Sequence, residues 1–232
     1  MSTIPGSAQK NQILSALPDE VYQRLLPHLE AVDLTNGKVL YEIDEVIKHL
    51  YFPHDAMISL VTQMADGKIV EVGLVGNDGM SGIGSLMGKS KSYERAIVQI
   101  PNGGVRISVE VMREEFEAGG PVQKILLRYA NSLMRQVSQT AACNASHTTE
   151  ERLSRWLLMC HDRVQTARFN LTQEFLAEML GTRRGTVNVA AITLQSANLI
   201  QYQRGFITIV DRQGLEEFSC ECYQMLKSRN GD

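Results

Sequence analysis

The spacing of apolar residues changes along the chain, and each change predicts a different kind of secondary structure. Near the start, apolar residues recur every three to four positions, which predicts a short helix; they are Leu14, Leu17, Val21, Leu25 and Leu29. From Val32 onwards the chain carries short runs rich in β-branched residues, separated by Gly, Asn, Asp or Pro. These runs predict strands at 38–41, 57–64, 69–74 and 97–100. Many short strands favour a jelly roll or a barrel.

One β-hairpin is predicted more sharply than the rest. The runs 57–64 and 69–74 are joined by Ala65-Asp66-Gly67-Lys68. An Asp-Gly pair tolerates the positive φ angles of a tight turn, so the two runs are expected to pair with each other.

Helical spacing returns at Pro121 and continues for roughly three heptads. The apolar and small polar positions follow a four-three pattern, at Val122, Leu126, Tyr129, Leu133, Gln136 and Thr140. The pattern predicts either a coiled-coil seam between two copies of the chain or an amphipathic helix packed on its own β domain. The seam is favoured, with Leu126, Tyr129, Leu133 and Val137 at the dimer interface.

A second, helical domain is expected to begin after this helix. Thr148-Thr-Glu-Glu151 has the order of a capping box. Further on, Thr172 can cap a helix at 173–180, Gly181 ends it, and Thr182 can cap a helix at 183–197. Two short helices joined by a tight turn that contains glycine form a helix-turn-helix.

The second of these helices carries residue types that contact DNA. Arg183, Arg184, Thr186 and Asn188 lie near its start, where a recognition helix enters the major groove. Residues 199–210 then alternate around Arg204-Gly205 and predict a two-stranded wing with Arg204 at its tip. Thr172 and Gln173 complete the predicted contacts, on the DNA backbone with Arg204. The net charge of the chain is −3, yet residues 179–210 contain three arginines and no Asp or Glu. This local charge favours DNA binding.

Composition indicates a folded globular protein and bears on its location and on metal or cofactor binding. A length of 232 residues with 44% hydrophobic and 21% charged residues is typical of a folded globular protein. The sequence shows no membrane-spanning run and no signal peptide at its start, so a cytoplasmic location is expected. The four cysteines form no CxxC pair, and Cys220 and Cys222 are expected on different faces of one helix. The five histidines form no HxxxH or HExxH pair. No metal and no cofactor is therefore expected.

Residues 171–189 (LTQEFLAEMLGTRRGTVNV) and 194–200 (LQSANLI) resemble the winged helix-turn-helix of the Crp/Fnr transcription regulators. The resemblance implies an α+β chain: a cyclic-nucleotide-binding-like β jelly roll at 1–120, a dimerisation helix at 121–147, and a DNA-binding domain at 148–232. It further implies a homodimer on a near-palindromic operator, with double-stranded DNA, RNA polymerase and an unidentified small-molecule effector as partners.

The chain departs from the family pattern at both of its sites. In the recognition helix, Gly185 stands in place of the family's Glu and Val189 in place of its second Arg. In the nucleotide pocket, Met80 or Gly82 stands where the family has the Glu that holds the ribose, and Glu94 or Arg95 replaces the Arg-Ser pair that holds the phosphate. Losing both polar anchors weakens binding, so cyclic AMP is not the expected effector.

Two alternatives belong to other functional classes. An enzyme would use Cys160 with His161 or His147, but adjacency on one helix does not bring a thiol and an imidazole together, so no catalytic role is expected. A small-molecule or cyclic-nucleotide sensor could act through protein contacts without DNA. Salt-dependent binding to duplex DNA separates that sensor from a DNA-binding regulator.

Overall fold

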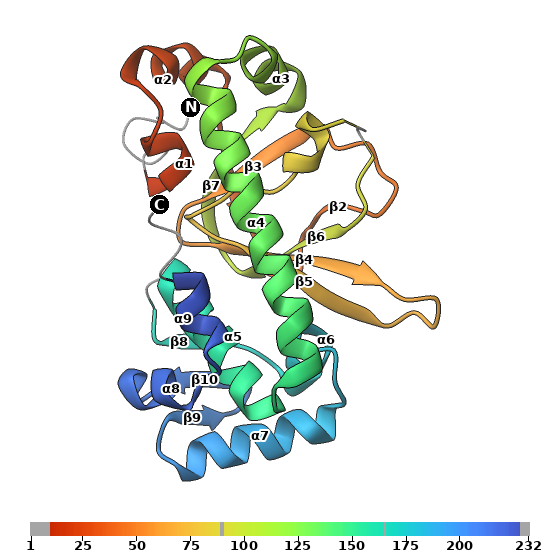
Figure 1. Cartoon of the computed structure of the whole chain (residues 1–232), viewed down its shortest axis with the longest axis vertical. Helices are drawn as coiled ribbons and strands as arrows, with labels where there is room; N and C mark the ends of the chain where they lie inside the picture. The colour runs from red at the N-terminus through yellow and green to blue at the C-terminus, as the bar shows by residue number, and fades with distance from the viewer. Residues whose placement is uncertain (1–9, 89–90, 165, 228–232) are drawn as a thin grey trace. The chain divides into compact units, whose positions relative to one another are not determined.

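The computed structural model describes residues 10–88, 91–164 and 166–227 (Figure 1). The chain divides into two compact units. The first contains Met1–Thr62 and Leu74–Met134, and the second contains Gln63–Gly73 and Arg135–Asp232.

Short helical segments precede the first strand of the first unit. They are α1 (Gln12–Ser15), α2 (Asp19–Leu25) and the 3-10 helix η2 (Leu26–His28). The single helix predicted here is wrong because Pro18 interrupts it: its backbone is extended, with ψ of 144°, and proline has no N–H to donate. The apolar positions are nonetheless buried as the spacing predicts, with Leu14 and Leu25 each 1% exposed.

Two sheets provide most of the first unit, although most of β5 falls in the second unit with the segment Gln63–Gly73. One has the strand order β1-β7-β3 and the other β2-β6-β4-β5. Their bounds are β1 (Glu30–Leu34), β2 (Val39–Tyr41), β3 (His49–Pro53), β4 (Met57–Gln63), β5 (Ile69–Val75), β6 (Arg95–Ile100) and β7 (Asn102–Ser108). Many neighbouring strands are far apart in sequence, as in a jelly roll. The four predicted strands and the β4–β5 hairpin are confirmed, while β1, β3 and β7 were not predicted.

Two helices follow the sheets, α3 (Val109–Glu117) and the 27-residue α4 (Gly120–Ser146). One face of α4 is buried: Val122 and Leu126 are each 2% exposed. The Tyr129 hydroxyl donates a hydrogen bond of 2.7 Å to the carbonyl oxygen of Met80. Leu126 is therefore buried on its own β domain and does not form an exposed seam, whereas Tyr129 is half-buried and its place at a dimer interface stays a prediction. Leu133 and Val137 are half-buried.

The second unit begins with a confirmed capping box. The Glu151 carboxylate accepts from the Thr148 backbone N–H at 2.8 Å, and the Thr148 hydroxyl accepts from the Glu151 N–H at 3.4 Å. The helix that follows is α5 (Thr149–Val164). The buried Trp156 indole donates to the Glu71 carboxylate at 2.8 Å, which ties strand β5 to α5.

The rest of the second unit surrounds a small sheet with the strand order β8-β10-β9. The elements are β8 (Arg168–Asn170), α6 (Gln173–Met179), α7 (Arg184–Ser196), β9 (Ile200–Gln203), β10 (Phe206–Ile209), α8 (Arg212–Phe218) and α9 (Cys222–Lys227). Among the residues described, no helix combines the length and the apolar character needed to cross a bilayer.

Candidate DNA-binding interface

Helices α6 and α7 form the predicted helix-turn-helix. The Thr172 hydroxyl caps α6 by accepting from the Phe175 N–H at 3.2 Å, as predicted. Gly181 has a φ of +58°, which suits glycine at the end of a helix. Arg183, and not Thr182, occupies the N-cap position of α7, because the extended backbone at Arg183 postpones the first helical residue to Arg184. The predicted Thr182 cap is therefore wrong by one position.

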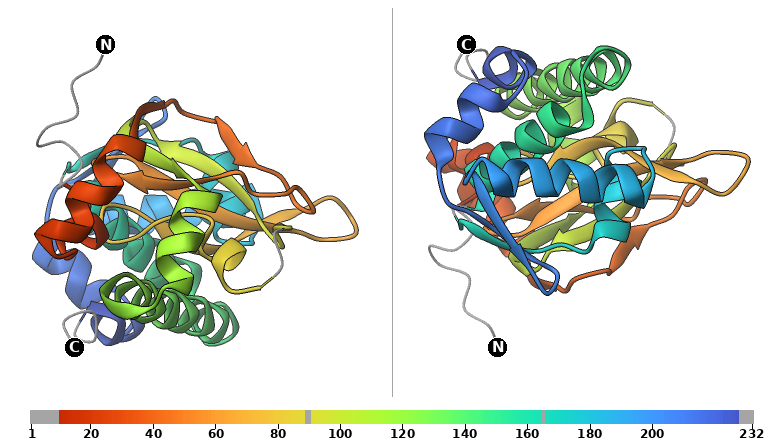
Figure 2. Two further views of the ribbon diagram at one scale, coloured as in Figure 1. Left: turned by 90° about the horizontal axis from the view of Figure 1, so that it is seen from above. Right: turned by 90° about the horizontal axis from the view of Figure 1, so that it is seen from below.

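The two faces of α7 differ sharply. Val187, Ala190 and Leu194 are fully buried, which holds the helix against the rest of the unit. The opposite face is exposed and carries Arg183, Arg184, Thr186, Asn188, Val189 and Ile192. Figure 2 shows α7 at the surface in the view from below, with the β9–β10 hairpin beside it. The four predicted polar residues are thus exposed, and two apolar residues that sequence reasoning did not single out are exposed beside them.

The β9–β10 hairpin forms the wing. Arg204 and Gly205 have positive φ angles of 51° and 80°, which a tight two-residue hairpin turn requires. The predicted two strands are confirmed, and β8 adds a third strand beside β10. The guanidinium of Arg168 lies 4.3 Å from the centre of the Phe206 ring.

A hollow of about 540 Å³ lies between the wing and the helix-turn-helix. Its lining residues are Thr172, Gln173, Glu174, Arg184, Tyr202, Arg204 and Gly205. It therefore brings together four of the seven predicted contact residues, namely Thr172, Gln173, Arg184 and Arg204. Asn188 is linked to the same group, since its side-chain oxygen accepts from the Gln173 amide at 2.8 Å. Arg183 and Thr186 lie outside the lining, on the exposed start of α7.

Positive charge dominates this surface. Within the described ranges, Arg183, Arg184 and Arg204 have no ion-pair partner, and Glu174 is the single acid that lines the hollow. Burial raises the pKa of Tyr202, and the charge of Arg184 opposes that rise. Three cations without internal partners are suited to bind an anionic backbone.

The predicted nucleotide-pocket residues lie in the first unit. Met80 is fully buried, and Gly82 has a φ of +92° just before the 3-10 helix η3 (Ile83–Leu86). Arg95 forms an ion pair with Glu42 at 2.7 Å, so its charge is already matched. Glu94 is half-buried, and burial raises the pKa of its carboxyl group. The absence of anchors for a cyclic nucleotide at this pocket stays a prediction.

The structure agrees with the sequence on Cys160 and differs from it on Cys220 and Cys222. Cys160 is fully buried, and burial raises the pKa of its thiol well above the ordinary value, which disfavours a nucleophilic role. Cys220 and Cys222 do not share one helix, because α8 ends at Phe218 and α9 begins at Cys222. Their thiols meet Cys143 and His147, which sequence reasoning missed although a Cys and a His four residues apart share a helix face.

Comparisons with known proteins agree with this geometry. Residues 151–218 match the family described as the Crp-like helix-turn-helix domain. No curated protein sequence matches the chain.

Several solved structures share the fold of most of the chain. FixK2 from Bradyrhizobium japonicum aligns with a TM-score of 0.70 at 14% identity, covering 83% of this chain and 98% of FixK2. A CRP-family transcriptional regulator from Thermus thermophilus aligns with a TM-score of 0.67 at 19% identity, covering 82% and 96%. The c-di-GMP responsive global regulator CLP from Xanthomonas campestris aligns with a TM-score of 0.65 at 15% identity, covering 83% and 99%.

A capped helix-turn-helix followed by a wing, with a surface rich in unpaired arginines, defines a DNA-binding domain of the winged type. Residues 151–218 are a Crp-like helix-turn-helix domain, and the chain as a whole has the fold of the Crp/Fnr regulators. The predicted resemblance is thereby confirmed: the helix-turn-helix segment matches the Crp-like family, and the fold of most of the chain is similar to that of solved Crp/Fnr regulators.

Proposed function

We propose that the protein is a homodimer that binds a near-palindromic operator and acts by binding rather than by catalysis. Helix α7 enters the major groove of each half-site, and the wing contacts the adjacent backbone. In this assignment residues 1–120 sense a signal, residues 121–147 dimerise, and residues 148–232 bind DNA. The site of action is the cytoplasm, with RNA polymerase as the partner through which bound protein alters transcription.

One observation carries the proposal: the exposed start of α7 and the tip of the wing present arginines toward one hollow without internal ion pairs. A guanidinium fork can bond the O6 and N7 atoms of guanine together, which makes Arg184 the base reader. Arg183, Thr186 and Asn188 assist it on α7. Thr172, Gln173 and Arg204 contact phosphates, because they lie beside α7 rather than on its exposed face.

The exposed apolar pair on α7 adds a second element of recognition. Val189 is 58% exposed and Ile192 is 55% exposed, and they lie three residues apart on the exposed face of one helix. Apolar side chains in the major groove contact the C5-methyl group of thymine. We therefore expect thymines in each half-site next to the guanine that Arg184 reads.

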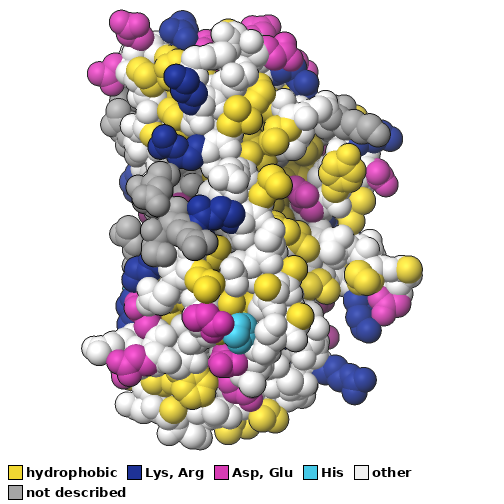
Figure 3. Space-filling view, viewed as in Figure 1, with side chains coloured by type: hydrophobic (Ala, Val, Ile, Leu, Met, Phe, Trp, Pro, Cys, Tyr) yellow, Lys and Arg dark blue, Asp and Glu magenta, His cyan; other side chains and the backbone are white. Residues whose placement is uncertain are grey.

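The dimer forms through a face of α4 other than the one first expected. Leu127 is 45% exposed and Met134 is 65% exposed. Leu127, Met134 and Ala141 follow one another at intervals of seven residues, so they share one face of the helix. Small or polar residues continue this face, at Asn131, Ser138 and Ala145. In Figure 3, hydrophobic side chains (yellow) are visible at several places on the face of the molecule that α4 crosses. A second copy of α4 covers this face in the dimer, with Leu133 and Val137 at its border.

The effector differs from cyclic AMP, because Arg95 is already paired with Glu42 and no acid stands at the ribose position. The structurally similar regulator CLP is responsive to c-di-GMP, a cyclic dinucleotide. A screen of effectors should therefore include cyclic dinucleotides beside cyclic mononucleotides.

Selection of bound fragments from the genome of the source organism tests the proposal. Purified full-length protein should enrich fragments that share an inverted repeat, with half-site centres about 34 Å apart. A duplex made from the repeat should bind more tightly than a scrambled duplex, by about a thousandfold or more. Equal binding to both duplexes would favour the alternative of a sensor that acts through protein contacts.

A further inference from the structure

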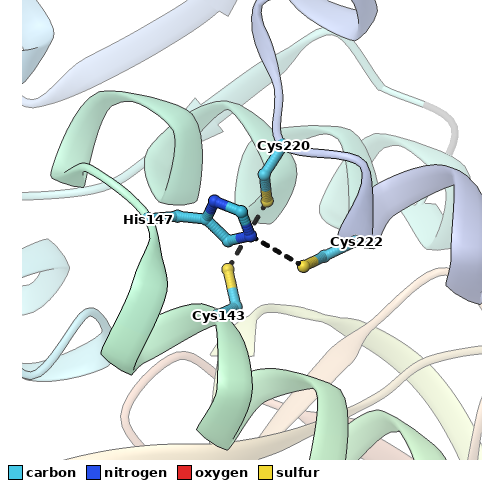
Figure 4. A group of neighbouring side chains, drawn as sticks. All are labelled: Cys143, His147, Cys220 and Cys222. Atoms are coloured by element: carbon cyan, nitrogen blue, oxygen red, sulfur yellow. Dashed lines mark hydrogen bonds between the residues drawn. The ribbon is translucent and has the colours of Figure 1, made fainter.

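Three thiols and one imidazole meet at the end of α4 (Figure 4). Cys143 and His147 come from the last turn of α4 and the residue after it, and Cys220 and Cys222 come from the link between α8 and α9 and the start of α9. The four potential ligand atoms all lie within 4.8 Å of one another. The Sγ atoms of Cys143 and Cys220 are 3.5 Å apart, and the Cys222 Sγ is 3.3 Å from His147 Nε2.

These separations fit one tetrahedral metal ion. With Zn–S bonds of about 2.3 Å and Zn–N bonds of about 2.0 Å, tetrahedral geometry places sulfur ligands about 3.8 Å apart and sulfur about 3.5 Å from nitrogen. A set of three thiols and one imidazole is a common structural zinc site. An iron–sulfur cluster needs its ligands spread around several iron and sulfide atoms, so this compact group is too small for one.

The surroundings of the cluster suit a negatively charged metal site. Three thiolates and one neutral imidazole around Zn²⁺ leave a net charge of −1. Arg155 is 4% exposed and Arg152 is 8% exposed, and neither has an acidic ion-pair partner in the described part of the chain. The Nε atoms of both guanidinium groups are buried without a hydrogen-bond partner. Buried cations without acidic partners favour a centre of negative charge within the same unit.

Neighbouring groups also orient two of the ligands. The Gln139 amide donates to the Cys222 sulfur at 3.0 Å, a contact that favours the thiolate. His147 turns Nε2 toward the thiols, while its Nδ1 lies 3.9 Å from the Glu151 carboxylate. A carboxylate on the far side of a ligating histidine is usual at zinc sites. The Glu221 carboxylate lies 3.5 Å from His147 Nε2, at the exposed edge of the cluster.

We propose that Cys143, His147, Cys220 and Cys222 bind one Zn²⁺ ion as a structural site. Four protein ligands leave no position for substrate, so the ion does not take part in catalysis. It ties the segment after α8, which follows the wing in sequence, to the end of α4. Deprotonated ligands are required, so binding releases protons and weakens at low pH.

The test measures zinc in the full-length protein, expressed with added zinc, purified without a polyhistidine tag and dialysed into metal-free buffer. About one zinc per chain is expected. Cys143→Ser with Cys220→Ser should abolish the zinc content, and His147→Gln should weaken binding. Cys160→Ala is the matched control, because Cys160 is buried outside the cluster, and it should retain the metal.

A second measurement is independent of whether the variants fold. Replacing zinc with Co²⁺ in the wild-type protein should give the strong visible absorption of a tetrahedral cobalt–thiolate centre. The proposal would be overturned if the wild-type protein bound no zinc or held cobalt in octahedral geometry. It would also be overturned if the double variant kept its zinc. A disulfide between Cys143 and Cys220 in the protein as purified under reducing conditions would likewise overturn it.

Discussion

The exposed face of α4 provides a quantitative test of the dimer. Replacing Leu127 and Met134 together by Ala removes the two large apolar side chains on that face while preserving helix propensity. In the single chain, Leu127 is 45% exposed and Met134 is 65% exposed to solvent. Because complete burial of such a side chain contributes about 2 kcal/mol, covering the remaining surface of both contributes about 2 kcal/mol per chain and about 4 kcal/mol per dimer.

About 1.4 kcal/mol of binding free energy corresponds to a tenfold change in the dissociation constant. The double variant should therefore raise the dimer dissociation constant about a thousandfold. Sedimentation equilibrium over a range of protein concentrations measures this constant. Arg128→Ala is the control, since Arg128 is exposed on α4 but lies about 100° around the helix from Leu127. An unchanged dissociation constant for Leu127→Ala with Met134→Ala, in a protein with normal unfolding behaviour, would refute this face as the interface.

Further predictions concern the first unit. Cyclic AMP and cyclic GMP should show no binding by calorimetry at physiological concentrations, and a low-micromolar affinity would contradict the account of Arg95 and Glu94. Gly82→Ala should destabilise the protein by about 1–3 kcal/mol in urea unfolding, because φ is +92° and the new Cβ would lie 3.0 Å from the Leu50 side chain; Gly84→Ala, which meets nothing within 4 Å, should not. Burial raises the pKa of Glu94, so the folded state holds this proton more tightly than the unfolded state and stability falls as pH rises through the raised pKa. Glu94→Gln should flatten that pH dependence in urea unfolding, and an unaltered pH profile would contradict it.

Local signals were enough to predict the DNA-binding domain. The Thr172 cap, the positive φ at Gly181 and the Arg204-Gly205 turn each act within a few residues, so sequence alone revealed them. The β4–β5 hairpin was predictable for the same reason. The one-residue error at Thr182 reflects the low precision of helix ends.

Features that depend on contacts between distant segments were not predictable. Helix α4 carries one set of heptad-spaced positions that includes Leu126 and another that includes Leu127 and Met134. The contact of Tyr129 with Met80 decides which set faces inward, and no local pattern reports it. Likewise, Cys220 joins Cys143 because the chain leaves helical geometry at Ser219, where ψ is 156°. The burial of Arg152 and Arg155 beside that cluster also requires the folded unit.

The central claim is that Arg184 reads a base and Arg204 contacts phosphate. The most direct test measures the affinity of Arg184→Ala and Arg204→Ala for operator and scrambled duplexes over a range of salt concentrations. Arg184 reads a base, so Arg184→Ala should weaken operator binding by about 1–3 kcal/mol more than binding to scrambled DNA. Arg204 meets phosphate at the wing tip, so Arg204→Ala should weaken both duplexes alike and lower the salt slope by about one per subunit. Equal losses on both duplexes for Arg184→Ala would contradict its role as the base reader, and unchanged binding for both variants would contradict the interface itself.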